Sequence, residues 1–124
     1  MGFFEEFREL SEGSTFAAPT LDHPFVELSN PVCGDLVRMR VQIEQGRVAY
    51  YGYQQKGCWP VSGCLELLGQ LSQGATLEQI VGFRLDDFLA LVRDVPVSKR
   101  HAFSLGHRAL IAAASQAARP GHGD

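Results

Sequence analysis

The sequence has 124 residues, of which 45% are hydrophobic and 20% are charged. This length suits one domain of roughly 100–150 residues, and the composition excludes a chain that is too polar to form a core. The formal net charge of −3 and the isoelectric point of about 5.8 exclude the strongly basic surface of a typical nucleic-acid-binding domain.

Residues 1–6 lack the positive start and the apolar run of a signal peptide. No stretch approaches the ~20 apolar residues that span a bilayer. We therefore expect a cytoplasmic protein that binds neither membranes nor nucleic acid. Its three cysteines, Cys33, Cys58 and Cys64, make an odd count. In that compartment, free thiols, metal ligands or redox chemistry are expected rather than a disulfide framework.

The first part of the chain predicts a helix, a loop and a strand. Aromatic and aliphatic residues follow helical spacing over residues 3–10. Residues 11–19 are rich in Gly, Ser, Thr and Ala and are typical of a connecting loop. Residues 23–28 predict a short strand, in which Pro24 suits the strand start or a sheet edge.

A β-hairpin follows. Residues 37–44 alternate strictly between apolar and polar side chains, which indicates a strand with one face against a core. Gln45-Gly46 interrupts the alternation, and residues 47–55 resume it as the return strand. The adjacent Tyr50 and Tyr51 indicate a bulge in that return strand.

The period changes from two to that of a helix after Gly57. Residues 61–71 predict a helix, and Gly74 ends that segment. Thr76 and Gln79 have the spacing of a capping box at the start of a second helix, in which each side chain bonds the backbone of the other residue.

Two further helices complete the predicted fold. Residues 86–92 form one, which Pro96 follows, and Ser98 is expected to cap a final helix that runs to about residue 118. Strands followed by helices predict an α+β domain, a three-stranded antiparallel sheet with helices packed on one face. We expect residues 1–118 to be that single domain and residues 119–124 to be a flexible tail.

Two cysteines and a carboxylate are predicted to meet at one end of the hairpin. Asn30-Pro31 and Gly34 predict a tight turn that holds Cys33 at the rim of the sheet, two residues before Asp35. Cys58 lies where the return strand gives way to a helix. Since paired strands lie ~4.8 Å apart, the two thiols are expected within reach of one metal ion. Amide groups at the helix start are expected to lower the pKa of Cys58.

The other candidate residues have simpler interpretations. Cys64 lies in an apolar helical stripe and is expected to be a small buried side chain. Six residues of helix separate it from Cys58 by about 600° and ~9 Å, so a shared metal site is not expected. The final helix begins near Lys99, Arg100 and His101, where charged residues are usually solvated. The remaining histidines are expected to be structural or solvated: His23, His107 and His122.

The segment Asn30-Pro31-Val32-Cys33-Gly34-Asp35 resembles the NPxCGD motif of iron–sulfur cluster scaffold proteins of the IscU, SufU and NifU N-terminal type. The Gly57-Cys58 strand end and the Lys99-Arg100-His101 helix start follow in that family's order. The resemblance implies an IscU/SufE-like fold without enzymatic activity. It also implies a site for zinc or a nascent iron–sulfur cluster, and a cysteine desulfurase or other cluster-assembly protein as partner. The ligand positions carried over are Cys33, Asp35, Cys58 and His101.

The sequence also departs from that family. Ala102 stands where the third cysteine is expected, and Trp59-Pro60 replaces the small residues that usually follow the second cysteine. Two alternatives to a metal-binding scaffold therefore stay open. In one, Cys58 accepts a persulfide and transfers its sulfur. In the other, a degenerate homologue keeps only an interaction surface, an apolar patch around Trp59 and Phe103. The sequence leaves homo-oligomerisation open.

Overall fold

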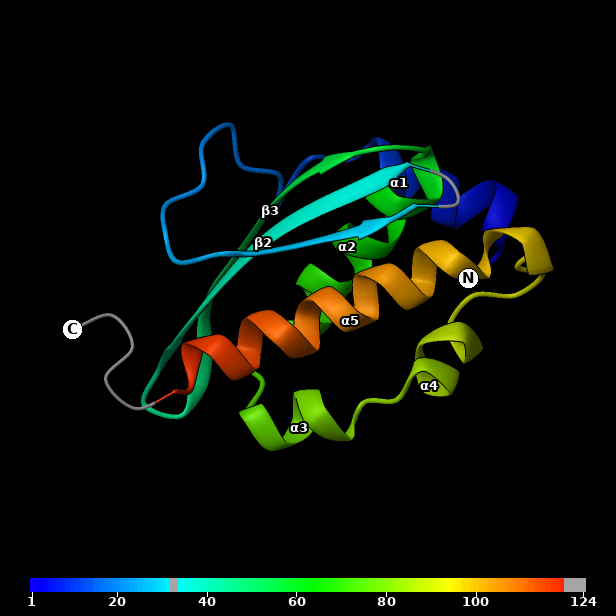
Figure 1. The fold of residues 1–124 in the computed structure, drawn as a ribbon. Coiled ribbons are helices and arrows are strands. Elements are labelled where there is room, and N and C mark those ends of the chain that lie inside the picture. The colour runs from blue at the N-terminus through cyan, green and yellow to red at the C-terminus, as the bar shows by residue number, and fades with distance from the viewer. Residues whose placement is uncertain (32–33, 120–124) are drawn as a thin grey trace.

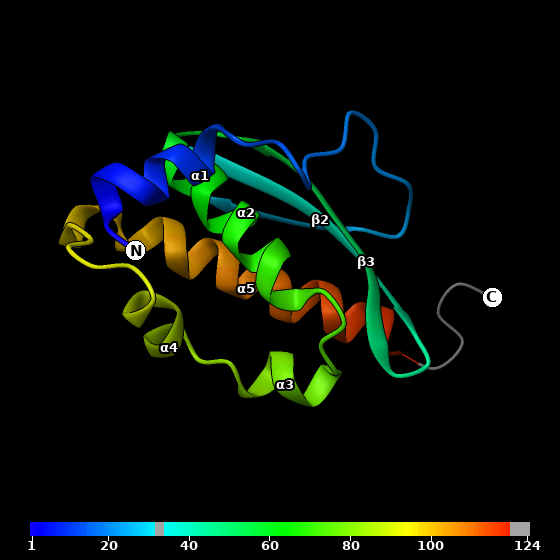
Figure 2. The same ribbon diagram turned by 180° about the vertical axis from the view of Figure 1, so that it is seen from behind.

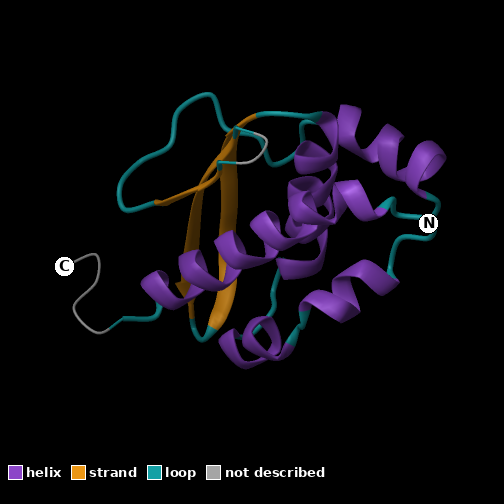
Figure 3. Ribbon diagram, turned by 45° about the vertical axis from the view of Figure 1, so that its right-hand side comes forward, coloured by secondary structure: helices purple, strands orange, loops and turns teal. Residues whose placement is uncertain are grey.

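The three strands form one antiparallel sheet in the order β1-β2-β3, and the helices lie on one side of it (Figures 1 and 3). The structure is a computed structural model that describes residues 1–31 and 34–119. This arrangement confirms the predicted α+β architecture. The elements run η1 (Phe3–Phe7), α1 (Arg8–Glu12), β1 (Val26–Asn30), β2 (Asp35–Glu44), β3 (Arg47–Lys56), α2 (Trp59–Ser72), α3 (Leu77–Gly82), α4 (Leu85–Ala90), η2 (Val97–Lys99) and α5 (Arg100–Ala117).

The hairpin forms as its alternation predicts. On β2 the apolar side chains of Val37, Met39 and Val41 are buried, while the arginines between them are only partly covered. The β2–β3 register shifts between Gln42 and Ile43, which pair with Tyr50 and Val48. The extra residue is therefore Ala49, so the bulge lies one residue before the predicted tyrosine pair.

The first strand begins later than predicted, at Val26, and extends to Asn30. Residues 23–25 lie outside it, because Pro24 has no amide hydrogen to donate to a sheet ladder. Arg40 instead holds this segment, since its guanidinium donates hydrogen bonds to the carbonyls of Asp22 and Pro24 at 3.1 and 3.2 Å.

Helices α2 and α5 cover the inner face of the sheet (Figure 2). They approach closely at Gly106, where an added Cβ would lie 3.2 Å from Leu68 and 3.4 Å from Cys64. Cys64 is fully buried there, as its apolar stripe predicts. Burial also raises the pKa of its thiol, which suits an inert core residue rather than a ligand.

A buried carboxylate that the sequence did not reveal fixes the loop before β1. Glu66 on α2 accepts hydrogen bonds from the backbone amides of Thr15 and Phe16 at 3.1 and 3.2 Å. It also accepts one from the hydroxyl of Tyr53 at 2.7 Å. Burial and this hydrogen bond raise the pKa of Tyr53. The predicted loop is thereby tied to both the sheet and α2.

The later helices confirm the predicted capping box and correct one boundary. Thr76 accepts a bond from the Gln79 amide at 3.1 Å, and the Gln79 side chain accepts one from the Thr76 amide at 2.9 Å. Ser98 does not cap α5. It lies inside η2, a short 3₁₀ turn closed by the bond from the Lys99 amide to the Pro96 carbonyl, and α5 begins after it.

The final helix ends at Ala117, close to the predicted end. The predicted tail falls mainly on residues 120–124, which lie outside the described residues. Across the described part of the chain, every helix is too short or too polar to cross a membrane.

Replacing Thr76 tests the capping box. Thr76→Ala removes the acceptor of the Gln79 amide and should lower the free energy of unfolding by about 1 kcal/mol. Thr76→Ser keeps the hydroxyl and should stay close to wild type. Chemical denaturation of the three proteins measures the difference, and equal loss in both variants would contradict the capping role.

Candidate metal centre

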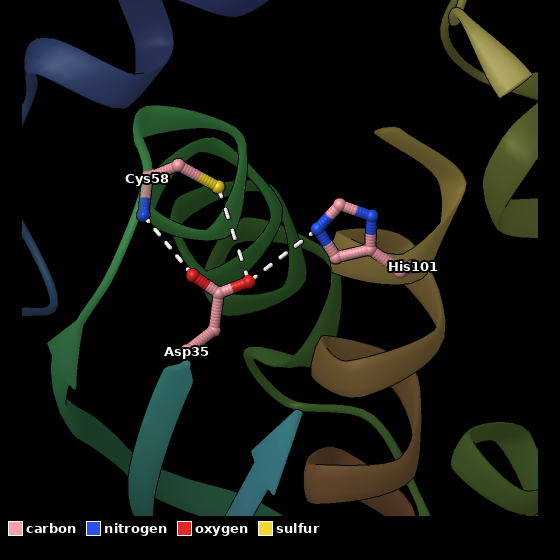
Figure 4. Close-up of side chains that lie close together, drawn as sticks. All are labelled: Asp35, Cys58 and His101. Carbon is pink, nitrogen blue, oxygen red and sulfur yellow. Dashed lines mark hydrogen bonds and ion pairs between the residues drawn. The ribbon is translucent and has the colours of Figure 1, made fainter. Parts of the chain in front are cut away.

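Three side chains with metal-binding atoms converge where the sheet meets the starts of two helices (Figure 4). Asp35 is the first residue of β2, Cys58 is the N-cap residue of α2, and His101 lies in the first turn of α5. One ligand atom from each lies within 4.8 Å of the others. Residues from three elements, 66 positions apart along the chain, thus share one small site.

Asp35 lies at the middle of this group and is only 1% exposed. Its Oδ1 accepts a hydrogen bond from the Cys58 amide at 3.2 Å. Its Oδ2 lies 3.9 Å from the Cys58 sulfur and 3.4 Å from His101 Nε2. The carboxylate therefore faces both other candidate ligands.

Gly57 allows this placement of the carboxylate. Its φ of +149° is a conformation that other residues rarely adopt, and an added Cβ would collide with Asp35 Oδ1. The sequence pattern indicates Gly57 only as the end of a strand. Its position directly before a cysteine was the signal that could have indicated a close approach of backbone to the site.

His101 presents a buried nitrogen to the site. Its Nε2 is shielded from solvent, and the Asp35 carboxylate lies 3.4 Å from it without forming a hydrogen bond among the residues that the structure describes. The contact with Asp35 is an ion pair only when the ring is protonated. A metal ion could give this buried nitrogen a stronger interaction than the long contact with Asp35, because neutral imidazole is a common metal ligand.

The predicted lowering of the Cys58 pKa is wrong. Burial of the thiol and, after it, the negative charge of Asp35 raise the pKa. Hydrogen bonds to backbone amides at the helix start act in the opposite direction but are outweighed. Without a metal, Cys58 is therefore mainly a neutral thiol at pH 7, and metal binding must displace its proton.

The remaining predicted residues are placed as follows. Cys33 lies outside the described residues. Cys64 is not part of the group. The apolar patch predicted around Trp59 and Phe103 is not formed, because Phe103 is fully buried and Trp59 packs against Phe3 with ring centroids 4.9 Å apart. Ala102 is also fully buried.

The donor set fits a metal ion. Zinc accepts nitrogen, sulfur and oxygen ligands, and its bonds of ~2.0–2.3 Å place tetrahedral ligand atoms roughly 3.3–3.8 Å apart. The observed limit of 4.8 Å is wider by about 1 Å, a gap that small side-chain rotations can close. Asp35, Cys58 and His101 could supply three ligands, and a fourth would be needed for a closed tetrahedral site.

The family model for the NifU-like N-terminal domain matches residues 10–119, most of the chain. The chain belongs to this family. The match covers Asp35, Cys58 and His101 together with the whole sheet and α5. It confirms the resemblance drawn from the Asn30–Asp35 motif.

Two curated relatives of this NifU-like domain come from Archaeoglobus fulgidus and are named iron–sulfur cluster assembly scaffold proteins IscU 1 and IscU 2. Each is 25% identical to the chain over 83 residues, which is 67% of this chain and 54% of the relative. The match thus spans about half the length of these curated relatives.

Solved structures share the fold of this NifU-like domain. An N-terminal NifU-like protein from Brucella abortus superposes with a TM-score of 0.73 at 14% identity, covering 93% of this chain and 94% of that one. A putative SUF-system scaffold protein from Fervidobacterium islandicum gives a TM-score of 0.66 at 16% identity, with coverage of 88% and 94%. At these identities the similarity establishes the fold alone.

The charge of Asp35 should contribute to the raised pKa of Cys58, after burial. In metal-free protein, Asp35→Asn removes the negative charge that raises the Cys58 pKa, so that pKa should fall and alkylation at pH 7 should accelerate. Alkylation rates of the Cys58 peptide, followed by mass spectrometry from pH 6 to pH 10, measure the shift. Glu78→Gln on α3 is the control, and an unchanged or higher pKa in Asp35→Asn would contradict the effect.

Proposed function

We propose that this protein is a scaffold of iron–sulfur cluster assembly that binds zinc or a nascent cluster through Cys33, Asp35, Cys58 and His101. The single observation that carries the proposal is the convergence of Asp35, Cys58 and His101 from three elements, with one ligand atom of each within 4.8 Å of the others. The names of the Archaeoglobus relatives support the same role.

The proposed ligand set would hold a cluster weakly. Iron–sulfur clusters usually rest on four cysteine thiolates, whereas this set offers two thiolates, one imidazole and one carboxylate. Weak retention suits a protein that hands its cluster on to another protein. The cluster is therefore cargo in this proposal, and a cysteine desulfurase is the partner that would supply the sulfur.

The two alternatives receive less support from the site. A persulfide acceptor should have an activated thiolate, but burial and Asp35 raise the pKa of Cys58. A degenerate interaction module would not need three potential ligands at one point. Its expected apolar surface around Phe103 is buried in the core. Binding and transfer, rather than catalysis, remain the proposed role.

Metal analysis tests the proposal directly. Anaerobically purified wild type should contain near-stoichiometric zinc or iron, and Cys33→Ser, Cys58→Ser and His101→Ala should each lose most of it, because each removes one ligand. Cys64→Ala removes a cysteine outside the site and should retain the metal. Acid-labile sulfide accompanying iron identifies a cluster.

Metal-free wild type, or equal loss of metal in Cys64→Ala, would overturn the proposed site. Zinc without sulfide, even after anaerobic reconstitution with iron and sulfide, would support a metal site but contradict the scaffold role.

Restoring the family's third thiolate position provides a second test. Ala102→Cys should slow the decay of a reconstituted cluster by about tenfold. Replacing residues that contact metal ligands changes metal affinity by a similar factor. Ala102→Ser adds a side chain of similar size without a thiolate and should not slow the decay. The decay of visible absorbance after removal of excess iron and sulfide gives the rates. Equal rates in the two variants would contradict a vacant thiolate position at residue 102.

A further inference from the structure

The segment formed by η1 and α1, residues 3–12, packs directly beside the residue that follows Cys58. The Trp59 ring lies 4.9 Å from that of Phe3 and 6.2 Å from that of Phe7. The guanidinium of Arg8 lies 5.7 Å from the centre of the Trp59 ring, within the range of a cation–π interaction. Three side chains of this N-terminal segment thus surround the side chain next to a candidate ligand.

The same segment reaches the helix that carries the histidine. The Phe7 ring stacks on Phe103 at 5.2 Å, and Phe103 follows His101 by two residues on α5. Phe7 is fully buried, and Gly63 on α2 leaves room for it, because a Cβ there would lie 2.6 Å from the Phe7 ring. Phe7 therefore lies against both ligand-bearing helices.

Backbone hydrogen bonds attach the start of the segment to the connection that leads into α5. The Phe3 amide donates to the Arg93 carbonyl at 3.0 Å, and the Arg93 amide donates to the Met1 carbonyl at 2.7 Å. The ribbon shows this first part of the chain lying beside the starts of both α2 and α5 (Figure 2). The segment thus contacts α2, α5 and the connection before α5.

Cys58 itself needs support from its neighbours. It is an N-cap residue with an extended backbone (φ −77°, ψ 160°), and it follows Gly57, a residue of high conformational freedom. The Cys58 amide donates to Asp35 Oδ1, and its carbonyl accepts a bond from the Val61 amide at 3.1 Å. Packing of Trp59, the next residue, adds to this hold on the direction of the thiol. A metal site must be held to within roughly 0.5 Å to bind well, so such support affects affinity.

We propose that residues 3–12 are a positioning element of the metal centre, with Trp59 as the positioning residue that transmits their packing to Cys58. Docking of this segment and binding of metal then favour each other, since both require the same arrangement of the starts of α2 and α5. The part of this inference that concerns metal affinity rests on the proposed function. The packing of the segment against Trp59 does not require a bound metal.

Phe3→Ala tests the inference, because it removes a Trp59 contact without altering α2, α5 or any candidate ligand. Its matched control is Ile80→Ala, which removes an equally buried side chain on α3. Phe3→Leu keeps apolar volume and replaces Phe3→Ala should the latter fail to fold by circular dichroism. Two quantities are measured: the Zn²⁺ dissociation constant, by competition with a chromophoric chelator, and the alkylation rate of Cys58 in metal-free protein.

We expect the Phe3 variant to bind Zn²⁺ at least about fivefold more weakly, the lower end of typical coupling between sites. Cys58 alkylation should accelerate in the same variant, and Ile80→Ala should leave both quantities near wild type. The emission of Trp59, the single tryptophan, should shift on Zn²⁺ binding in wild type and shift less in the Phe3 variant.

Unchanged affinity and unchanged alkylation in a folded Phe3 variant would overturn the inference while leaving the proposed metal site intact. Equal effects in Ile80→Ala would also overturn it, because they would reflect general stability. A wild type that binds no metal overturns the proposed function instead, and the alkylation rates then decide by themselves whether the segment holds Cys58.

Discussion

The Asp35 carboxylate lies almost fully buried at the junction of the sheet with the starts of α2 and α5, and its charge needs compensation there. The Cys58 amide supplies one hydrogen bond, and Gly57 supplies the space that lets the carboxylate approach. His101 lies on the other side of the same carboxylate. Cys58 and His101 thus both lie against the Asp35 carboxylate.

The buried Asp35 carboxylate also affects whether the Cys58 thiol is protonated. In the absence of metal, burial and, after it, the negative charge of Asp35 raise the Cys58 pKa, so the thiol keeps its proton. A divalent cation reverses that balance, since it attracts both the carboxylate and the thiolate. The raised pKa therefore argues against a reactive free thiolate at Cys58. For that reason we propose metal binding rather than sulfur transfer.

A cluster of aromatic rings also connects the elements that carry the candidate ligands. Trp59 departs from the small residue expected at its position, and it is partly buried. It packs with Phe3 and Phe7, and Phe7 continues to Phe103 on α5. A residue that suggested degeneration in the sequence therefore belongs to the packing that connects the two ligand-bearing helices.

The sequence by itself determined the features that depend on near neighbours. The alternation of apolar and polar residues predicted the hairpin, and the spacing of Thr76 and Gln79 predicted the capping box. The motif that ends at Asp35 indicated the family. The predicted hairpin also brought Asp35 and Cys58 to one end of the sheet, and the family resemblance added His101. Only the tertiary structure decided that Asp35 is buried between them and that the Cys58 pKa rises. Burial and the distance between charges depend on residues far apart in the chain, and no local pattern encodes them.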